Sequence, residues 1–152
     1  MKIITDLRDR VMDFNTKLTD GTLISKIVVE NEAYIVDMNA EVQLFEHGEN
    51  ALGVDISSYR PYSPLTIQIK KMKGQPTNRV TLRDEGDFES SFFLQVNNEQ
   101  FEIKAADFKT EELIQKYGKA ILGLTDANLQ ELIWQYIFPD LMKEAKETIY
   151  GN

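Results

Sequence analysis

The sequence contains no cysteine and a single histidine, His47. Without cysteine there is no disulfide framework, no thiol nucleophile and no thiolate ligand for a metal. One histidine is also too few for a histidine-based metal centre. It leaves His47 as the one histidine that could act as the base of a catalytic triad. His47 follows Glu46 near a predicted helix end, and we interpret it as an exposed helix-terminal residue. We therefore expect neither a metal site nor a cofactor.

Long apolar runs and nucleotide-binding motifs are missing as well. No apolar run approaches the roughly 18 residues that span a membrane, and the N-terminal stretch MKIITDLRDRVMDF is too charged for a signal peptide. No GxSxG, HExxH, GxGxxG or phosphate-loop pattern occurs. These absences favour a protein that is not an enzyme and has no membrane partner.

Carboxylates are plentiful, and four of them cluster in one short stretch. A small cell-wall hydrolase that uses two of these acids is one alternative function, because glycosidases need two carboxylates at a fixed separation. The simpler interpretation is a solvated, exposed bend. The cluster consists of Asp84, Glu85, Asp87 and Glu89.

The length and the hydrophobic pattern together predict one α+β domain. A chain of 152 residues can bury a sizeable core. The expected fold is mostly helical, with a long N-terminal helix, a central β-hairpin and C-terminal helices. Residues 1–20 and 139–152 are expected to be peripheral to this domain, which spans residues 1–152.

Two helices are predicted before Gly48, which suits the left-handed position after a helix end. The first covers residues 5–18 and the second residues 22–47, although the β-branched segment Ile27-Val28-Val29 would also suit a strand. The stripe of the second helix is heptad-like, which indicates either an ordinary core helix or a seam that also packs on a neighbouring subunit. The apolar stripes are Leu7, Val11, Phe14 and Leu18 in the first helix, and Ile24, Val28, Asn31, Ile35, Met38, Val42 and Phe45 in the second.

The middle of the chain is expected to contain two short helices. Ser63 followed by Pro64 is typical of a helix start, and it predicts a helix that runs to Met72. The alternation in its TIQIK stretch would equally suit a strand. A short extended segment at 80–82 and a bend then lead into one helical turn at 87–90.

A β-hairpin is predicted next. Residues 92–96 and 100–104 form the two strands, and Asn97-Asn98-Glu99 suits a tight turn. A lone hairpin is marginally stable, so we expect it to pack on the helices or to join a neighbour's sheet.

The C-terminal part is predicted to be helical. Thr110 is expected to cap a helix of about two turns that Gly118 ends, and Thr125 is expected to cap the last helix. Pro139 should break or kink that last helix at Phe138. We expect Trp134 to lie in the core, together with a buried stripe of Leu129, Leu132, Ile133, Tyr136 and Ile137.

One stretch is basic although the chain has a net charge of −8: no acidic residue lies between Asp55 and Asp84. Three interpretations remain open, namely a solvated loop, a surface that docks on an acidic partner such as another copy, and contact with DNA phosphates. We define the basic strip as the six cations Arg60, Lys70, Lys71, Lys73, Arg79 and Arg83.

Three short motifs follow one another in a fixed order. After a helix that ends in LFEHG come GVDISSYRPYSPLTIQIKK, then LRDEGDFESSF, and, beyond the hairpin, ILGLTDANLQELI. In this order the chain resembles the phage virion-morphogenesis or tail-completion proteins, which belong to the neck between head and tail. The positions that carry the resemblance are Tyr59, Pro61, Ser63, Thr66 and Lys70 in the first motif, Leu82, Gly86, Phe88 and Ser91 in the second, and Leu122, Gly123, Leu124, Thr125 and Asp126 in the third.

The resemblance implies a structural virion protein that is assembled in the host cytoplasm. Copies would form a ring at the head–tail junction, with six favoured over twelve by analogy, between portal-side neck proteins and the tail. DNA would pass through its channel without sequence-specific contacts, and hairpins of adjacent copies could pair edge to edge to close a barrel. The alternative is a morphogenesis or minor capsid factor that is absent from the mature virion.

The motif residues would then have structural tasks. Gly86 permits a sharp bend, Phe88 anchors that bend in the core, and Ser91 bonds the backbone before the first strand. Leu122 and Leu124 would bury the entry to the last helix.

Overall fold

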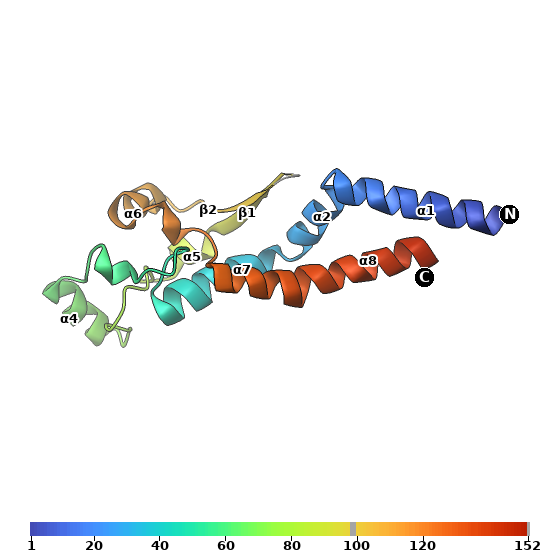
Figure 1. The fold of residues 1–152 in the computed structure, drawn as a ribbon. Coiled ribbons are helices and arrows are strands. Elements are labelled where there is room, and N and C mark those ends of the chain that lie inside the picture. The colour runs from blue at the N-terminus through green and yellow to red at the C-terminus, as the bar shows by residue number, and fades with distance from the viewer. Residues whose placement is uncertain (98–99, 152) are drawn as a thin grey trace.

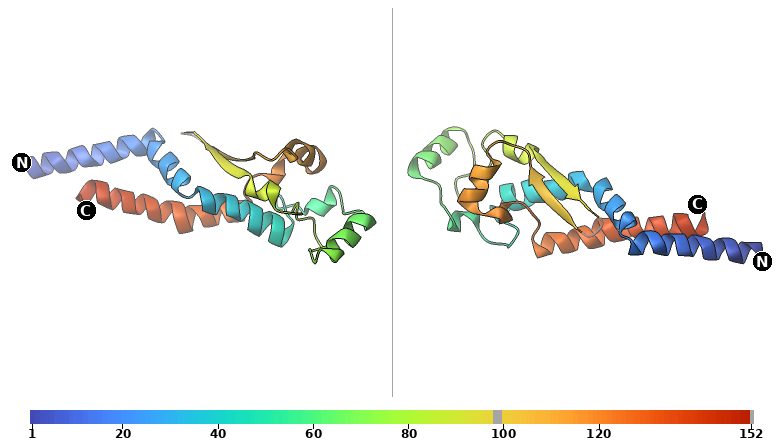
Figure 2. Two further views of the ribbon diagram at one scale, coloured as in Figure 1. Left: turned by 180° about the vertical axis from the view of Figure 1, so that it is seen from behind. Right: turned by 90° about the horizontal axis from the view of Figure 1, so that it is seen from above.

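Two long helices run side by side away from the rest of the molecule (Figure 1). They are α1 (Lys2–Thr19) and α8 (Phe138–Tyr150), and we call the pair the arm. The remaining elements form the body, which carries the hairpin above the helices (Figure 2). This computed structural model describes residues 1–97 and 100–151. The predicted fold class is confirmed: the domain is α+β, mostly helical, with a two-stranded antiparallel sheet and a long N-terminal helix.

The N-terminal helix α1 is longer than the predicted range of 5–18. None of its 18 residues, all of which are described, is buried. Phe14 and Leu18 of its apolar stripe are half-buried, whereas Leu7 and Val11 are exposed. The helix ends at Asp20, whose carboxylate accepts a hydrogen bond from the backbone N–H of Thr22.

The predicted helix of residues 22–47 is divided into three consecutive segments. They are α2 (Thr22–Glu30), α3 (Glu32–Asp37) and η1 (Met38–His47), a π-helix. The break lies at Asn31, whose side-chain amide donates to the carbonyl oxygen of Ile27 and to Asp140. Gly48 ends the last segment at a φ of 64°, as predicted.

The stripe of this long helical region faces the core over only part of its length. Val28, Ile35 and Met38 are buried, and the other four stripe residues are half-buried. The most deeply buried apolar side chains come from both halves of the chain: Ile27, Ile35, Leu44, Ile56, Ile121 and Leu132.

The short helices of the middle region form as predicted. In α4 (Pro64–Met72) the Ser63 hydroxyl accepts the backbone N–H of Thr66 at 3.1 Å, which selects the helix over the strand alternative. A 3₁₀ turn, η2 (Ile56–Ser58), precedes it, and α5 (Asp87–Ser90) is the predicted single turn. The expectation of an extended Leu82 is wrong, because this residue has a φ of 61°.

The hairpin consists of β1 (Phe92–Val96) and β2 (Phe101–Ala105), so the second strand starts one residue later than predicted. Phe92 pairs with Ala105 and Val96 with Phe101. The backbone N–H of Asn97 donates to the carbonyl of Gln100 at 2.9 Å. The rest of the predicted turn, Asn98 and Glu99, lies outside the described residues.

The helix α6 (Thr110–Tyr117) ends at Gly118 as predicted, but Thr110 is not its cap. Thr110 is the first helical residue, and its hydroxyl donates to the carbonyl of Asp107 at 2.6 Å. The 3₁₀ turn η3 (Lys119–Ile121) follows. Thr125 caps α7 (Asp126–Leu132) as predicted, since its hydroxyl accepts the backbone N–H of Asn128.

Pro139 does not end the last helix. A π-helical segment, η4 (Ile133–Ile137), leads directly into α8, and Pro139 lies in the first turn of α8. A π turn shifts the backbone hydrogen-bond register by one residue, so the chain passes the missing N–H of proline without leaving the helix.

The predicted stripe of α7 and η4 is confirmed only in part. Leu132 is buried and Ile133 is 36% exposed, while the other three stripe residues are half-buried. Trp134 is not in the core, because it is 62% exposed.

Candidate docking surface

The basic strip does not form one surface. Lys70 is buried at 7% exposure, and its ammonium group donates to the Gln75 side chain at 3.0 Å and to the carbonyl oxygen of Arg83 at 2.8 Å. It also lies 5.1 Å from the centroid of the Tyr62 ring. Lys70 therefore fixes the segment after α4 to the bend and has no freedom to contact a partner.

Arg83 is likewise engaged inside the molecule. Its guanidinium forms two hydrogen bonds to the carboxylate of Glu41 and one of 3.3 Å to Glu89. The hydrogen bond to Glu41 is the main cause that raises the pKa of Arg83. A planar guanidinium suits this bidentate geometry. The result is a fixed link between η1 and the bend.

Arg79 binds the end of η1. Its Nε donates to the carbonyl oxygen of Phe45 at 2.6 Å, and its guanidinium carbon lies 5.7 Å from the centroid of that ring. The guanidinium carbon of Arg83 lies 4.2 Å from the same centroid. Two cations of the strip thus contact one aromatic ring, and their role is structural.

The acidic cluster does not behave as one solvated surface either. Asp84, Glu85 and Asp87 are exposed, but Glu89 is only 6% exposed. Burial raises the pKa of Glu89, and its Oε2 has no hydrogen-bond partner among the described residues. The prediction of four solvated acids is therefore wrong at Glu89, because its side chain is buried beside Arg83, with its Oε1 3.3 Å from the Nε of that residue.

Three cations of the strip remain at the surface. Lys73 forms a 2.6 Å ion pair with Asp84, which raises the pKa of the lysine and lowers that of the aspartate. Arg60 and Lys71 are exposed and make no side-chain hydrogen bond or ion pair with any residue that the structure describes. Of the six cations of the basic strip, those that remain available for docking on a partner are therefore Arg60, Lys71 and Lys73.

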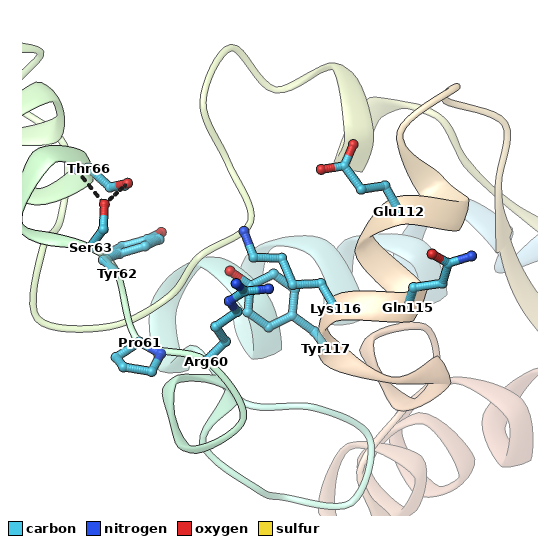
Figure 3. A pocket seen from close by; sticks show the side chains of 9 residues that line it. All are labelled: Arg60, Pro61, Tyr62, Ser63, Thr66, Glu112, Gln115, Lys116 and Tyr117. Carbon is cyan, nitrogen blue, oxygen red and sulfur yellow. Dashed lines mark hydrogen bonds between the residues drawn. The ribbon is translucent and has the colours of Figure 1, made fainter.

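Arg60 lines a polar cavity of about 490 Å³ between the start of α4 and helix α6 (Figure 3). Lys116 and Glu112 contribute charges from α6, and the hydroxyls of Ser63 and Thr66 are bonded to each other at 2.8 Å. Such a cavity offers ion pairs and hydrogen bonds to a partner's polar side chain. The first motif contributes Pro61, Ser63 and Thr66 to this wall.

The hydroxyls of the two tyrosines in the first motif region, Tyr59 and Tyr62, form hydrogen bonds with other segments of the body. The Tyr62 hydroxyl accepts the backbone N–H of Thr81 at 3.0 Å, and the Tyr59 hydroxyl accepts the side-chain amide of Asn50 at 3.3 Å. Tyr59 is still 49% exposed, so its ring is available at the surface.

The second motif forms the predicted bend and anchor. Gly86 has a φ of 91°, and the buried Phe88 packs edge to face on Phe92 with centroids 4.9 Å apart. The Ser91 hydroxyl donates to the carbonyl of Phe88 at 2.7 Å and accepts the backbone N–H of Asp107 at 3.0 Å. Ser91 therefore ties the bend to the end of the hairpin.

The third motif is held by two buried amides that the sequence interpretation missed. Asn39 donates to the carbonyl of Ile121 at 3.1 Å and accepts the N–H of Gly123 at 3.0 Å. Gln43 donates to the carbonyl of Gly123 and accepts the N–H of Thr125, both at 2.8 Å. Asn39 and Gln43 stand four residues apart, so they share a face of a predicted helix, and this spacing was the available signal. Leu122 and Leu124 beside them are half-buried, and Asp126 is exposed.

The two edges of the hairpin differ. On β1, the backbone N–H of Leu94 points away from β2 and donates to the carboxylate of Glu32 at 2.9 Å. On β2, an apolar groove of about 810 Å³ runs along the strand as far as Leu122, Leu124 and Leu129. One backbone N–H on the edge of β1 is therefore already bonded to a side chain, whereas β2 is bordered by an apolar groove.

No group of three or more histidine, aspartate or glutamate side chains among the described residues is arranged to hold a metal ion. Within the same part of the chain, none of the helices combines the length and the hydrophobicity that a membrane crossing requires. Neither a protein-family model, nor a curated protein, nor a solved structure matches the chain.

Proposed function

We propose that the protein is a structural component of the neck of a tailed phage particle, where copies form a ring that joins head and tail. The proposal combines the order of the three motifs with one structural observation. That observation is the exposed arm: none of the 18 residues of α1 is fully buried.

Most helical stability in proteins comes from packing an apolar face, and α1 packs only part of its apolar face on its own chain. Here Ile3, Ile4, Leu7 and Val11 point apolar side chains to the surface. Helices of this kind are stabilised when a partner covers them. The arm therefore supports a function in assembly.

The tasks of the motif residues support the same proposal. Gly86 and Phe88 shape a bend, Ser91 ties it to the hairpin, and Thr125 caps a helix. All of these contacts position backbone. They give the body a fixed shape, as a ring subunit needs if copies are to meet in a repeating geometry.

The test is protein mass spectrometry of tailed particles purified from cells that make this protein. A neck ring requires the protein in mature particles at a ring-like number, with six copies expected and twelve as the alternative. Presence in assembling heads but absence from mature particles would instead identify a morphogenesis factor.

The hydrolase alternative has its own assay. The variant in which Asp84, Glu85, Asp87 and Glu89 are all replaced by their amides should have the same effect on peptidoglycan as the native chain, namely none. Lytic activity that the native protein shows and this variant lacks would overturn the structural proposal.

A further inference from the structure

Two apolar ridges of equal length stay exposed on this chain. The arm ridge consists of Ile3, Leu7 and Val11 on α1, which are 82%, 44% and 43% exposed. The junction ridge consists of Trp134, Phe138 and Met142, where η4 meets α8, and these are 62%, 45% and 43% exposed. The members of each ridge are spaced four residues apart. Rows of this spacing are the ridges that interdigitate in the commonest class of helix packing.

The arm ridge projects beyond its helical neighbour. Arg10 of α1 donates to the carbonyl oxygen of Ile149 at 3.4 Å, so Arg10 lies opposite the end of α8. The residues before Arg10 therefore extend past α8 (Figure 1). At a rise of about 1.5 Å per residue, this overhang is on the order of 12 Å long. It is long enough to carry Ile3 and Leu7 to another molecule.

The junction ridge has the composition of an interface centre. The rings of Trp134 and Phe138 lie 5.5 Å apart, and the indole N–H is already bonded to Gln130 at 3.3 Å. The exposed remainder of this tryptophan is therefore apolar. Tryptophan is enriched among the residues that contribute most to protein binding, and aromatic residues and methionine are enriched at interfaces.

The charges around the two ridges are complementary. Residues 1–11 carry three basic side chains and two acidic ones, whereas residues 120–143 carry three acidic side chains and one basic one, Lys143. The whole chain has a net charge of −8, so most pairs of surfaces on two copies repel each other. The basic set is Lys2, Arg8 and Arg10, and the acidic set of the junction region is Asp126, Glu131 and Asp140.

We propose that the arm ridge of one copy packs on the junction ridge of the next copy. The N-terminus of α1 lies at the free end of the arm, whereas α8 begins where the arm meets the body (Figure 1), so the two ridges do not meet within one molecule. The contact is therefore head to tail, and its repetition generates a closed ring or an open filament. The inference rests on the proposed function for the ring itself. It adds which surfaces of two neighbouring subunits contact each other.

Cysteine cross-linking tests this contact, because the native chain has no cysteine. One tagged copy carries Leu7→Cys and a differently tagged copy carries Phe138→Cys, and the mixture is oxidised. We expect mixed dimers, and a ladder of higher multimers when both substitutions are in one chain. Thr5→Cys, which lies on the opposite face of α1, replaces Leu7→Cys as the matched control and should give few mixed dimers.

The lone tryptophan gives an independent readout. Its emission should shift to the blue as the protein concentration rises, because the arm of a second copy covers Trp134. Leu7→Glu should weaken this association on the order of tenfold or more, while Leu7→Met should preserve it.

Two results would overturn the inference. One is efficient cross-linking of Leu7→Cys with itself, which indicates a symmetric arm-to-arm contact. The other is a Trp134 emission that is independent of concentration and of Leu7→Glu, with mixed dimers no more abundant than in the Thr5→Cys control. Neither result bears on whether the protein is present in virions, so the proposed neck function stands or fails separately.

Discussion

The body and the arm use their side chains in different ways. The body buries apolar residues from both halves of the chain around Asn39 and Gln43, whose amides bind the backbone of residues 121–125. In the arm, neither α1 nor α8 has a buried residue. The body therefore has the contacts that fix its own shape, whereas the arm leaves apolar area exposed.

Phe88→Ala should lower the free energy of unfolding the most. Phe88 is 4% exposed and anchors the bend on Phe92. Truncation of a buried phenylalanine costs about 3–5 kcal/mol. Urea unfolding measures the change. The control is Phe108→Ala, at a residue of the body that is 87% exposed, and a loss there as large as at position 88 would show that the burial of Phe88 does not stabilise the bend.

Gln43→Leu should lower the free energy of unfolding on the order of 3 kcal/mol, because it leaves several buried partners unbonded. The N–H of Thr125 and the carbonyl of Gly123 would lose their hydrogen bonds. The exposed Gln68→Leu on α4 is the matched control. Equal stability of the two variants would show that the amide network contributes nothing.

Gly48→Ala should destabilise the body more than Gly74→Ala. Both glycines have left-handed backbones, with φ values of 64° and 68°, so both variants carry conformational strain of about 1–2 kcal/mol. Only at Gly48 would the new Cβ meet another atom too closely, at 2.9 Å from the Cβ of Arg79. Thermal unfolding gives the midpoint temperature of each variant. A smaller decrease for Gly48→Ala than for Gly74→Ala would contradict the close packing of Gly48 against Arg79.

The pH dependence of stability should change in Glu89→Gln. Burial raises the folded-state pKa of Glu89 above its ordinary value of 4.5. Its contribution is therefore fully present below that pH and is lost as the pH rises through the folded-state pKa. Urea unfolding of both proteins from pH 4 upward should show the native chain losing stability relative to the variant. A difference that is constant with pH would contradict this assignment.

Ile3→Ala should leave the free energy of unfolding within about 0.5 kcal/mol of the native value, as is usual for surface positions. The same substitution at Ile35, which is fully buried, should cost about 2–5 kcal/mol. The pair compares one chemical change in the arm and in the body. Urea unfolding measures the free energy of unfolding of both variants. Similar losses of stability would show that the arm is buried in the free protein.

Local signals in the sequence were more reliable than long-range ones, although the cap predicted at Thr110 is wrong because Lys109 occupies that position. Ser63, Gly48 and Thr125 behave as predicted, because a helix cap is decided by a few neighbouring residues. Gly86 and Phe88 also fulfil their expected tasks at the bend. The class of the fold followed from the periodicity of the helices and the alternation in the hairpin.

The sequence pattern did not predict which side chains pair with residues far away in the chain. The basic strip looked continuous, but Lys70, Arg79 and Arg83 find partners up to 42 residues away in the chain. Trp134 looked like a core residue because its neighbours are apolar, yet the side of the helix it occupies depends on how the helix packs. The passage through Pro139 required a π-helical segment, which periodicity does not predict.

Cryo-electron microscopy of the neck of mature tailed particles can show the proposed ring itself. We predict a closed ring of copies, with six expected, in which the overhanging end of each α1 packs on the junction of η4 and α8 of the next copy. The proposal would be contradicted by mature particles that lack the protein and whose neck contains no ring that fits this elongated subunit.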